Sequence, residues 1–209
     1  MEIFTIGHSN YSVDELVDRL KFYAINCVVD IRGTPYSKYN IQFNKEVIRE
    51  TLRNKGYMYI YMGKEFAAQR QDKTLYTEEG YADFEKVVLD KDFLKGIERL
   101  KDGCKKGYKI VLMGAMQDPI RCHRCILLGR ALEEAGFHLR HILDDYTLAS
   151  QDEMEERLLE KYEYNSGQLT LGPLGGQTLS RQEMLKECYT KSNREIGYRV
   201  EKIGREEKA

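Results

Sequence analysis

The chain has 209 residues, of which 42% are hydrophobic and 32% charged, and its formal net charge is −1. This composition excludes a disordered chain, and the length suits one domain or one domain with an extension. Because the charges nearly cancel, we expect any anion site to be local, without the basic field that drives non-specific binding to nucleic acid.

The chain carries no feature that predicts export or membrane insertion. Its first residues lack the basic, apolar and small-residue order of a signal peptide, and no apolar run approaches the ~18 residues of a membrane span. The five cysteines, an odd number, are typical of reduced thiols. We therefore predict a cytoplasmic protein with no membrane partner and leave its oligomeric state open.

Strand and helix patterns alternate along most of the chain. We predict strands at residues 3–6, 27–31, 57–62, 108–113 and 137–143. Helices are expected after Ser12, at 45–54, over 81–101 with a break near Asp90, from Asp118 to about Ala135, over 150–162 and over 179–192. Residues 64–79 are expected to form a long loop or lid. The alternation predicts an α/β fold with a mostly parallel sheet of about five strands, helices on both faces and a C-terminal helical extension.

The alternation weakens after Asp145. We therefore predict a core domain at residues 1–146 and an extension at 147–209 that packs on the core or projects from it. Within the extension, four glycines mark a loop and the charged residues 201–209 are expected to fray; the glycines are Gly167, Gly172, Gly175 and Gly176.

Three loops with unusual polar residues leave the ends of predicted strands. They contain His8 with Ser9 and Asn10, Asp30 with Arg32, and the segment Gly114–Arg124. Ligands of open α/β sheets bind beyond the carboxyl ends of the strands. If the strands are parallel, the three loops lie at one edge of the sheet and predict a functional site there.

The segment from Asp118 to Arg124 is the most informative. Asp118 and Pro119 are typical of a helix start, where free N–H groups favour an anion such as phosphate or carboxylate. Arg121 and Arg124 lie three residues apart and could bind it together. The alternative is that the arginines are solvated or pair with Asp118. Cys122, beside these cations, is a candidate nucleophile, although a buried structural thiol is an equal alternative.

His8 and His123 are candidate general acids or bases. Asp30 could act as a base or orient His8 while Arg32 binds an anion; the alternative is an internal salt bridge between the two. Gln42 and Asn44 stand among aromatic residues, a pattern that suits a base or sugar and also an ordinary loop. If the following loop folds over the site, Glu65 is a further carboxylate.

Cys122 and Cys125 form a C-x-x-C pattern, which is also found in metal and redox sites. Cys125 precedes Ile126, Leu127 and Leu128, so we favour a core position for it. The local ligand set is incomplete for a tetrahedral metal site, so no metal is predicted, and the sequence names no cofactor.

These residues resemble the bacterial and archaeal family known as domain of unknown function 488. The similarity covers roughly residues 2 to 160 in the same order, and the segment Glu195–Arg199 is similar to the tails of some members. It rests on Thr5–Asn10, Val29–Arg32 before Pro35, Gln42–Asn44, and Asp118-Pro119 followed by Cys122–Arg124. The resemblance implies a shared fold and pocket.

One segment departs from the family pattern. Many members read Leu-Met-Cys-Ala-Glu where this chain has Leu112–Met116, so Gly114 and Met116 stand at the Cys and Glu positions. The resemblance therefore implies that any activity relies on the six remaining residues of the pattern, which are His8, Asp30, Arg32, Cys122, His123 and Arg124. Glu65 is a further candidate.

Three functions stay open. The first is an enzyme that acts on a nucleotide-like or phosphorylated substrate by hydrolysis or group transfer, with arginines on the anion and histidines moving protons. The second, favoured by the absent Cys and Glu, is a non-catalytic module that binds a nucleotide or nucleic acid. The third is a metal or thiol redox protein built on Cys122 and Cys125. A small anionic ligand is the expected partner, and a nucleic-acid partner stays open.

Overall fold

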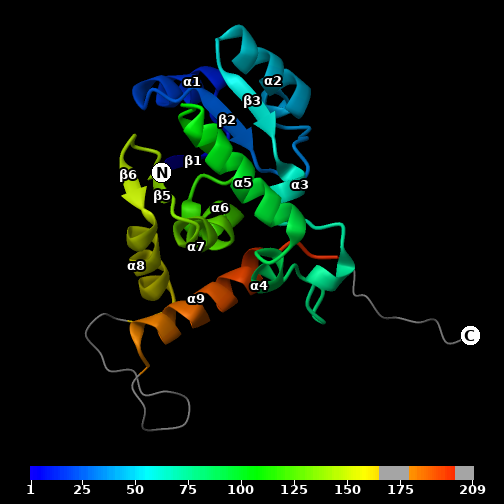
Figure 1. The fold of residues 1–209 in the computed structure, drawn as a ribbon, viewed down its shortest axis with the longest axis vertical. Coiled ribbons are helices and arrows are strands. Elements are labelled where there is room, and N and C mark those ends of the chain that lie inside the picture. The colour runs from blue at the N-terminus through cyan, green and yellow to red at the C-terminus, as the bar shows by residue number, and fades with distance from the viewer. Residues whose placement is uncertain (165–178, 201–209) are drawn as a thin grey trace, which may run out of the picture.

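The computed structural model describes residues 1–164 and 179–200, which form an α/β fold (Figure 1). The described strands are β1 (Glu2–Gly7), β2 (Cys27–Asp30), β3 (Met58–Tyr61), β4 (Ile110–Gly114), β5 (His138–Ile142) and β6 (Leu148–Ser150). They make one sheet in the order β3-β2-β4-β1-β5-β6. All neighbours are parallel except β5 and β6, which pair antiparallel. The predicted fold class is confirmed, with β6 as an added edge strand.

Helices cover both faces of the sheet. On one face lie α1 (Val13–Phe22) and α2 (Lys45–Asn54), whose buried residues join one apolar cluster. The other face carries α3 (Gly63–Phe66), α5 (Lys91–Lys105), α6 (His123–Ile126), α7 (Leu128–Glu134), α8 (Gln151–Lys161) and α9 (Arg181–Ile196), and α4 (Phe84–Val87) joins the same cluster. Three short 3-10 turns complete the elements at Ile41–Phe43, Lys73–Leu75 and Pro119–Arg121.

Strand residues alternate between the two clusters because side chains of a strand point to opposite faces. Val28 and Val111 belong to the cluster under α1 and α2, whereas Val29 and Leu112 belong to the other. Both faces are therefore apolar, which explains why β2 and β4 are almost uniformly hydrophobic. Capping boxes begin two of the expected helices: Ser12 and Glu15 cap α1, and Ser180 and Glu183 cap α9.

The helix predicted from Asp118 to Ala135 is wrong as a single element. It begins as expected, since Asp118 Oδ1 accepts a hydrogen bond from the Ile120 N–H at 3.3 Å. The chain then leaves the helical conformation at Cys122 (φ −134°, ψ 144°), so a 3-10 turn, α6 and α7 follow one another. The loop expected at 64–79 likewise contains α3 residues and the turn Lys73–Leu75.

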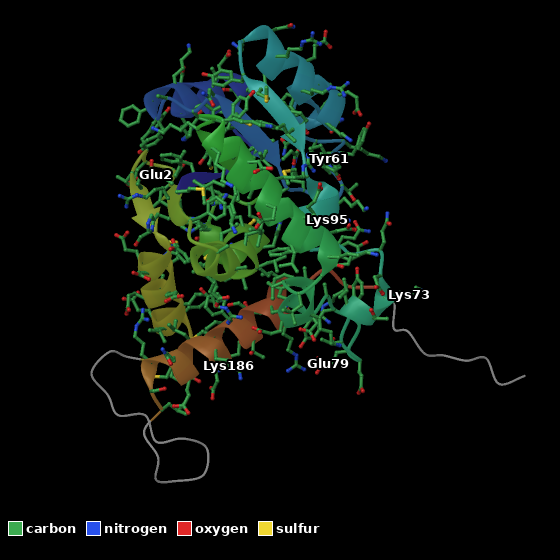
Figure 2. The ribbon with its side chains drawn as sticks, viewed as in Figure 1. Glu2, Tyr61, Lys73, Glu79, Lys95 and Lys186 are labelled. Atoms are coloured by element: carbon green, nitrogen blue, oxygen red, sulfur yellow. The ribbon has the colours of Figure 1, made fainter. Side chains whose placement is uncertain are left out.

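The part after residue 146 contacts the core closely. Strand β6 extends the sheet, and Asn193 of α9 donates a hydrogen bond to the Ala82 carbonyl at 2.8 Å. Figure 2 shows the side chains that fill the space between α9 and the helices above it. The domain boundary at 146 stays a prediction. The predicted glycine loop and the frayed end at 201–209 lie outside the described residues.

Candidate active site

The loops after β1, β2 and β4 meet at one edge of the sheet because β2, β4 and β1 are parallel neighbours. Main-chain hydrogen bonds join them directly. The His8 N–H donates to the Gly114 carbonyl at 3.0 Å and the Ser9 N–H to the Ala115 carbonyl at 2.9 Å. The three predicted loops therefore form one cluster at the carboxyl ends of the strands.

Asp30 and Arg32 form a buried ion pair. Asp30 Oδ1 accepts hydrogen bonds from Arg32 Nε at 2.9 Å and from the Arg32 N–H at 3.1 Å, and Oδ2 accepts one from Arg32 Nη2 at 2.6 Å. A second donor to Oδ2 is the Tyr59 hydroxyl, at 2.6 Å. The carboxylate of Asp30 is fully buried. The charge of Arg32 and the hydrogen bonds to both carboxylate oxygens offset the cost of removing it from water.

Arg32 also connects this pair to His8. Its Nη1 lies 3.0 Å from His8 Nε2, and its Nη2 donates to the Phe43 carbonyl at 2.9 Å. The other ring nitrogen, Nδ1, lies 2.8 Å from the Ser9 carbonyl, so Nδ1 carries the proton and Nε2 accepts from Arg32. Burial and the charge of Arg32 lower the pKa of His8 to about 4. A neutral imidazole with both nitrogens engaged holds Arg32 in place.

Cys122 and His123 form a second pair. Cys122 Sγ lies 3.7 Å from His123 Nδ1, and His123 Nε2 lies 3.2 Å from the Ile31 carbonyl. The carbonyl can only accept, so Nε2 carries a proton and Nδ1 is the nitrogen that faces the sulfur. A thiol, an imidazole and an oxygen that orients the imidazole are the three parts of a cysteine nucleophile with its base.

The two pKa values shift in opposite directions. Burial raises the pKa of the Cys122 thiol, but the charge and hydrogen bond of His123 and the charge of Arg124 lower it by more, to about 6. Burial lowers the pKa of His123, whereas the thiolate beside it raises it by more. Both shifts favour the charged forms, a thiolate beside an imidazolium. Cys122 is buried, with 3% of the residue exposed.

Arg124 does not face solvent. It is completely buried, and its guanidinium donates to the carbonyls of Met116, at 2.8 Å, and Gln117. These bonds hold the loop that follows β4. Its Nε has no hydrogen-bond partner within the described ranges. Burial lowers the pKa of Arg124, and the charge of the Cys122 thiolate opposes that shift. Arg121, by contrast, is exposed on the turn before α6.

The remaining predicted residues surround this cluster. Ser9 adopts a positive φ of 48° and donates to Asn10 Oδ1 at 3.2 Å. Gln42 donates to the Tyr11 carbonyl at 3.5 Å, and Asn44 Oδ1 accepts from the Ser37 N–H at 2.7 Å. Each of these contacts holds a loop around the cluster.

Glu65 has a different environment. It lies on α3, where its Oε1 forms an ion pair with Arg99 of α5. Its carboxylate is thus engaged in joining two helices.

Several contacts of the cluster were not predicted. The Phe43 ring stacks on the His8 ring with centroids 4.2 Å apart. Gly7 has no room for a side chain, since a Cβ there would overlap the Met116 carbonyl and Arg124 Nη1. At Gly114 a Cβ would lie 3.1 Å from Cys122 Sγ. The alternation of Phe43 with Gln42 and Asn44 was visible in the sequence, whereas the contacts of the two glycines depend on the fold.

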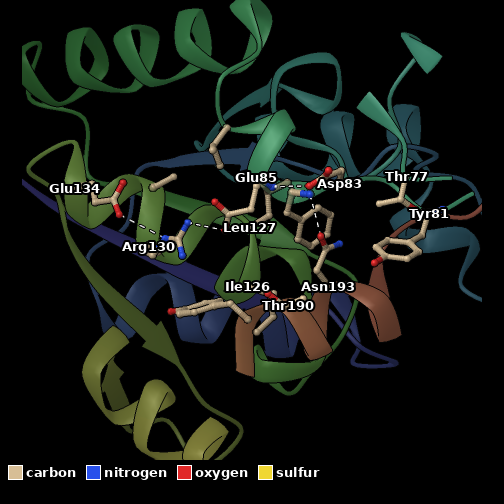
Figure 3. Close-up of a pocket in the computed structure, with 14 residues that line it drawn as sticks. Thr77, Tyr81, Asp83, Glu85, Ile126, Leu127, Arg130, Glu134, Thr190 and Asn193 are labelled. Carbon is tan, nitrogen blue, oxygen red and sulfur yellow. Dashed lines mark hydrogen bonds and ion pairs between the residues drawn. The ribbon is translucent and has the colours of Figure 1, made fainter. Parts of the chain in front are cut away.

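The cluster is closed. A cavity of about 200 Å³ lies elsewhere, between α4, α6, α7 and α9, with Arg130 paired to Glu85 and Glu134 (Figure 3). None of the predicted site residues lines it. Within residues 1–164 and 179–200, no group of three His, Cys, Asp or Glu side chains could hold a metal ion.

Comparison with known proteins supports the resemblance inferred from the sequence. The model of the family described as domain of unknown function DUF488 matches residues 12–131. The chain belongs to the DUF488 family. The match includes Asp30, Arg32 and the segment Cys122–Arg124, and stops before α8 and α9. No curated protein and no solved structure matches this DUF488 member. In the described part of the chain, no helix has the length and apolar character needed to span a bilayer.

Proposed function

We propose that the protein is an enzyme that uses the Cys122 thiolate as a nucleophile in hydrolysis or group transfer on a nucleotide-like or phosphorylated substrate. The observation that carries the proposal is the pair of Cys122 and His123, with Nδ1 3.7 Å from the sulfur and Nε2 on the Ile31 carbonyl. A thiolate is the reactive form of cysteine, and a pKa of about 6 makes it the major form at pH 7.

The geometry supports a two-step reaction. The sulfur of Cys122 would form a bond to the electrophilic phosphorus or carbon of the substrate, while the leaving group takes the Nδ1 proton of His123. Water or another acceptor would then give a proton back to Nδ1 as it attacks, and the thiolate would leave. Ile31 holds the imidazole in the tautomer that both steps require. His8, Asp30 and Arg32 are positioning residues, since their hydrogen bonds fix the strand end that carries the Ile31 carbonyl.

Access to the thiol would involve the loop after β4. Ala115, Met116 and Gln117 are exposed, and Gly114 leaves the sulfur without a covering side chain on that side. A movement of this loop would open the thiol to a substrate. The side chain of exposed Arg121 makes no hydrogen bond or ion pair in the described ranges, so it is the arginine best placed to meet an anionic group. The donors of Arg32 and the two terminal nitrogens of Arg124 are already engaged with protein atoms.

The test is turnover and covalent trapping with a panel of nucleotides and phosphomonoesters. We expect a Cys122 adduct by intact-mass analysis and product release, both lost in Cys122→Ser. His123→Gln should slow adduct formation at least tenfold, and Arg121→Gln should raise KM for anionic substrates with kcat little changed. Cys104→Ser changes a partly buried thiol on α5 and serves as the matched control. Product formation that persists in Cys122→Ser would sink the proposal.

A non-catalytic binding module is the second candidate. The complete internal pairing of Asp30, Arg32 and His8 and the burial of the thiol favour it. Saturable binding of a nucleotide without product or adduct would select it. A redox role is less well supported, because Cys125 Sγ lies beside Gln151 and burial raises the pKa of Cys125 to about 12.

A further inference from the structure

A second hollow lies at the opposite ends of the strands from Cys122. It measures about 620 Å³ and is found where β2, β3 and β4 begin, beside the end of α2 at the top of Figure 1. We call it the edge hollow, because β3 is the last strand of the sheet. Its lining residues are Asn26, Arg49, Arg53, Gly56, Tyr57, Met58, Tyr59 and Tyr108.

The edge hollow is positively charged. Arg49 and Arg53 are both exposed and stand four residues apart on α2, so their side chains leave the same helix face roughly 5–6 Å apart. Neither guanidinium makes a hydrogen bond or an ion pair with another described residue. No carboxylate is among the residues that line the hollow. The charge of Glu46 acts on Arg49 and that of Asp18 on Tyr57, but the lining itself carries two cations and no carboxylate in a chain with a net charge of −1.

Four of the other lining residues are aromatic or polarizable. Tyr57 and Tyr59 are partly buried against the apolar cluster under α1 and α2, Tyr108 is partly buried against the other cluster, and Met58 is 41% exposed. The Tyr59 hydroxyl donates to Asp30, which fixes that ring. Gly56 has a φ of +86°, and no atom lies within 4 Å of the place that its Cβ would take, so the turn from α2 into β3 is open on that side.

We propose that the edge hollow binds a short single-stranded stretch of nucleic acid, with phosphates at Arg49 and Arg53 and a base against the tyrosine rings. Unpaired cations beside aromatic side chains are how proteins bind single strands without strong sequence preference. A simple anion would use the arginines and leave the rings bare, and an apolar partner would bury two unpaired charges. A duplex keeps the faces of its bases stacked inside. The site is independent of the thiol chemistry proposed above.

The test is fluorescence anisotropy with a labelled short oligothymidylate, competed by thymidine monophosphate and by inorganic phosphate. We expect Arg49→Gln/Arg53→Gln to weaken oligothymidylate binding at least tenfold and to lower the slope of log Kd against log salt by about 1.4. Tyr108→Leu should weaken it about tenfold with the salt slope unchanged. The matched control is Lys21→Gln/Lys73→Gln, which removes equal charge from exposed residues elsewhere and should leave binding unchanged.

Three outcomes would overturn the proposal. They are no binding by the wild-type protein at low salt, equal binding by the arginine variant and the lysine control, or thymidine monophosphate binding as tightly as the oligothymidylate. The last would assign the edge hollow to a free nucleotide. The alkylation rate of Cys122 separates this proposal from the preceding one, because the arginine variant should retain the wild-type rate. Loss of the thiol reactivity with intact strand binding would remove only the enzymatic proposal.

Discussion

Cys122 has two neighbours that decide its chemistry, His123 and Arg124. His123 holds the proton that the thiol releases, and Arg124 is a buried cation without a carboxylate in contact with it. A buried charge requires an opposite charge or several hydrogen bonds. The thiolate supplies the opposite charge, and two main-chain carbonyls supply the hydrogen bonds. The same two cations therefore favour ionisation of a thiol that burial alone would keep neutral.

The ionisation of Cys122 can be measured by alkylation. We expect the rate of its reaction with iodoacetamide to follow a titration curve with a midpoint at about pH 6 and to level off at higher pH. The other cysteines should ionise only far above pH 7, because burial raises the pKa of Cys27 and Cys188 to about 11, of Cys125 to about 12, and also that of Cys104. Peptide mapping after limited labelling at pH 7 identifies the reacting thiol.

In His123→Gln the midpoint should move up by at least one pH unit, since the stabilising imidazolium is gone. An unchanged midpoint in that variant, or a wild-type midpoint near the value of a free thiol, would contradict the thiolate–imidazolium pair.

Two substitutions of Arg124 separate its charge from its hydrogen bonds. Arg124→Lys keeps the charge but can reach only one of the two carbonyls, so we expect a loss of about 2 kcal/mol in the free energy of unfolding with the Cys122 midpoint little changed. Arg124→Met removes the charge as well, so the Cys122 midpoint should rise. Urea unfolding gives the first quantity and alkylation the second. A rise of similar size in both variants would show that the charge of Arg124 does not stabilise the thiolate.

At the scale of elements, the turn after β1 is packed against the loop after β4. Gly7 makes this possible, because the Met116 carbonyl and Arg124 Nη1 occupy the place of its side chain. Gly7→Ala should therefore lower the free energy of unfolding by about 3 kcal/mol or more, since main-chain atoms and a buried arginine must move. Chemical denaturation measures the change.

Gly103→Ala is the control for Gly7→Ala. Gly103 lies within α5, and its added methyl would meet only the terminal Cδ1 of Ile110, which can rotate away. The gain in helix propensity, about 1 kcal/mol, should offset this contact, so we expect a change within about 1 kcal/mol. Equal losses in the two variants would mean that Gly7 is no tighter than a helix glycine.

The elements also show where reading a sequence succeeds and fails. The start of the helix at Asp118 is a local signal, because an aspartate before a proline satisfies the first N–H groups, and the prediction was right. The break at Cys122 is not local. It accompanies the inward course of Arg124 toward the carbonyls of Met116 and Gln117, which no pattern of neighbouring residues encodes. The three-residue strand β6 is likewise too short to give a periodic signal.

The same contrast applies to the site. Polar residues at strand ends predicted which loops converge, because parallel strands end at one edge. The sequence could not indicate that the donors of Arg32 are occupied, since one of them binds the Phe43 carbonyl eleven residues away along the chain. The edge hollow was missed because Arg49 and Arg53 resemble the exposed cations of any surface helix. Only the fold places three tyrosine rings beside them.

At the scale of the whole molecule, the sheet order places the segment after β4 between those after β1 and β2. Strand β4 comes late in the chain yet lies between two early strands. The order of strands therefore brings His123 against the Ile31 carbonyl on one side and Arg124 against Gly7 on the other. A polar chain continues away from this edge through the interior, from Thr5 to His141, Gln151 and Tyr189, and ends at Glu155.

This interior makes the stability of the whole fold sensitive to mild acid. Burial lowers the pKa of both His8 and His141 to about 4, whereas an unfolded histidine titrates near 6.5. Below pH 6.5 the unfolded chain binds protons that the native histidines do not bind, so the free energy of unfolding decreases as the pH decreases. Each histidine should contribute a loss of about 2 kcal/mol between pH 6.5 and 5. His123, whose pKa is raised in the native protein, keeps its proton there through this range and does not contribute to the fall.

The range between pH 6.5 and 5 lies above the titration of ordinary carboxyl groups, so the slope there reports the two buried histidines and, to a smaller extent, Cys122, whose pKa of about 6 also falls in this range. Urea unfolding across this range should show a decline of about 4 kcal/mol for the wild-type protein. His8→Gln/His141→Gln should abolish most of the slope whatever its effect on stability at pH 7. His138→Gln changes an exposed histidine on β5 and should leave the slope intact. If the double variant keeps the wild-type slope, the two buried histidines are protonated in the native protein, and His8 could not then accept the hydrogen bond from Arg32 that fixes the strand end beside Cys122.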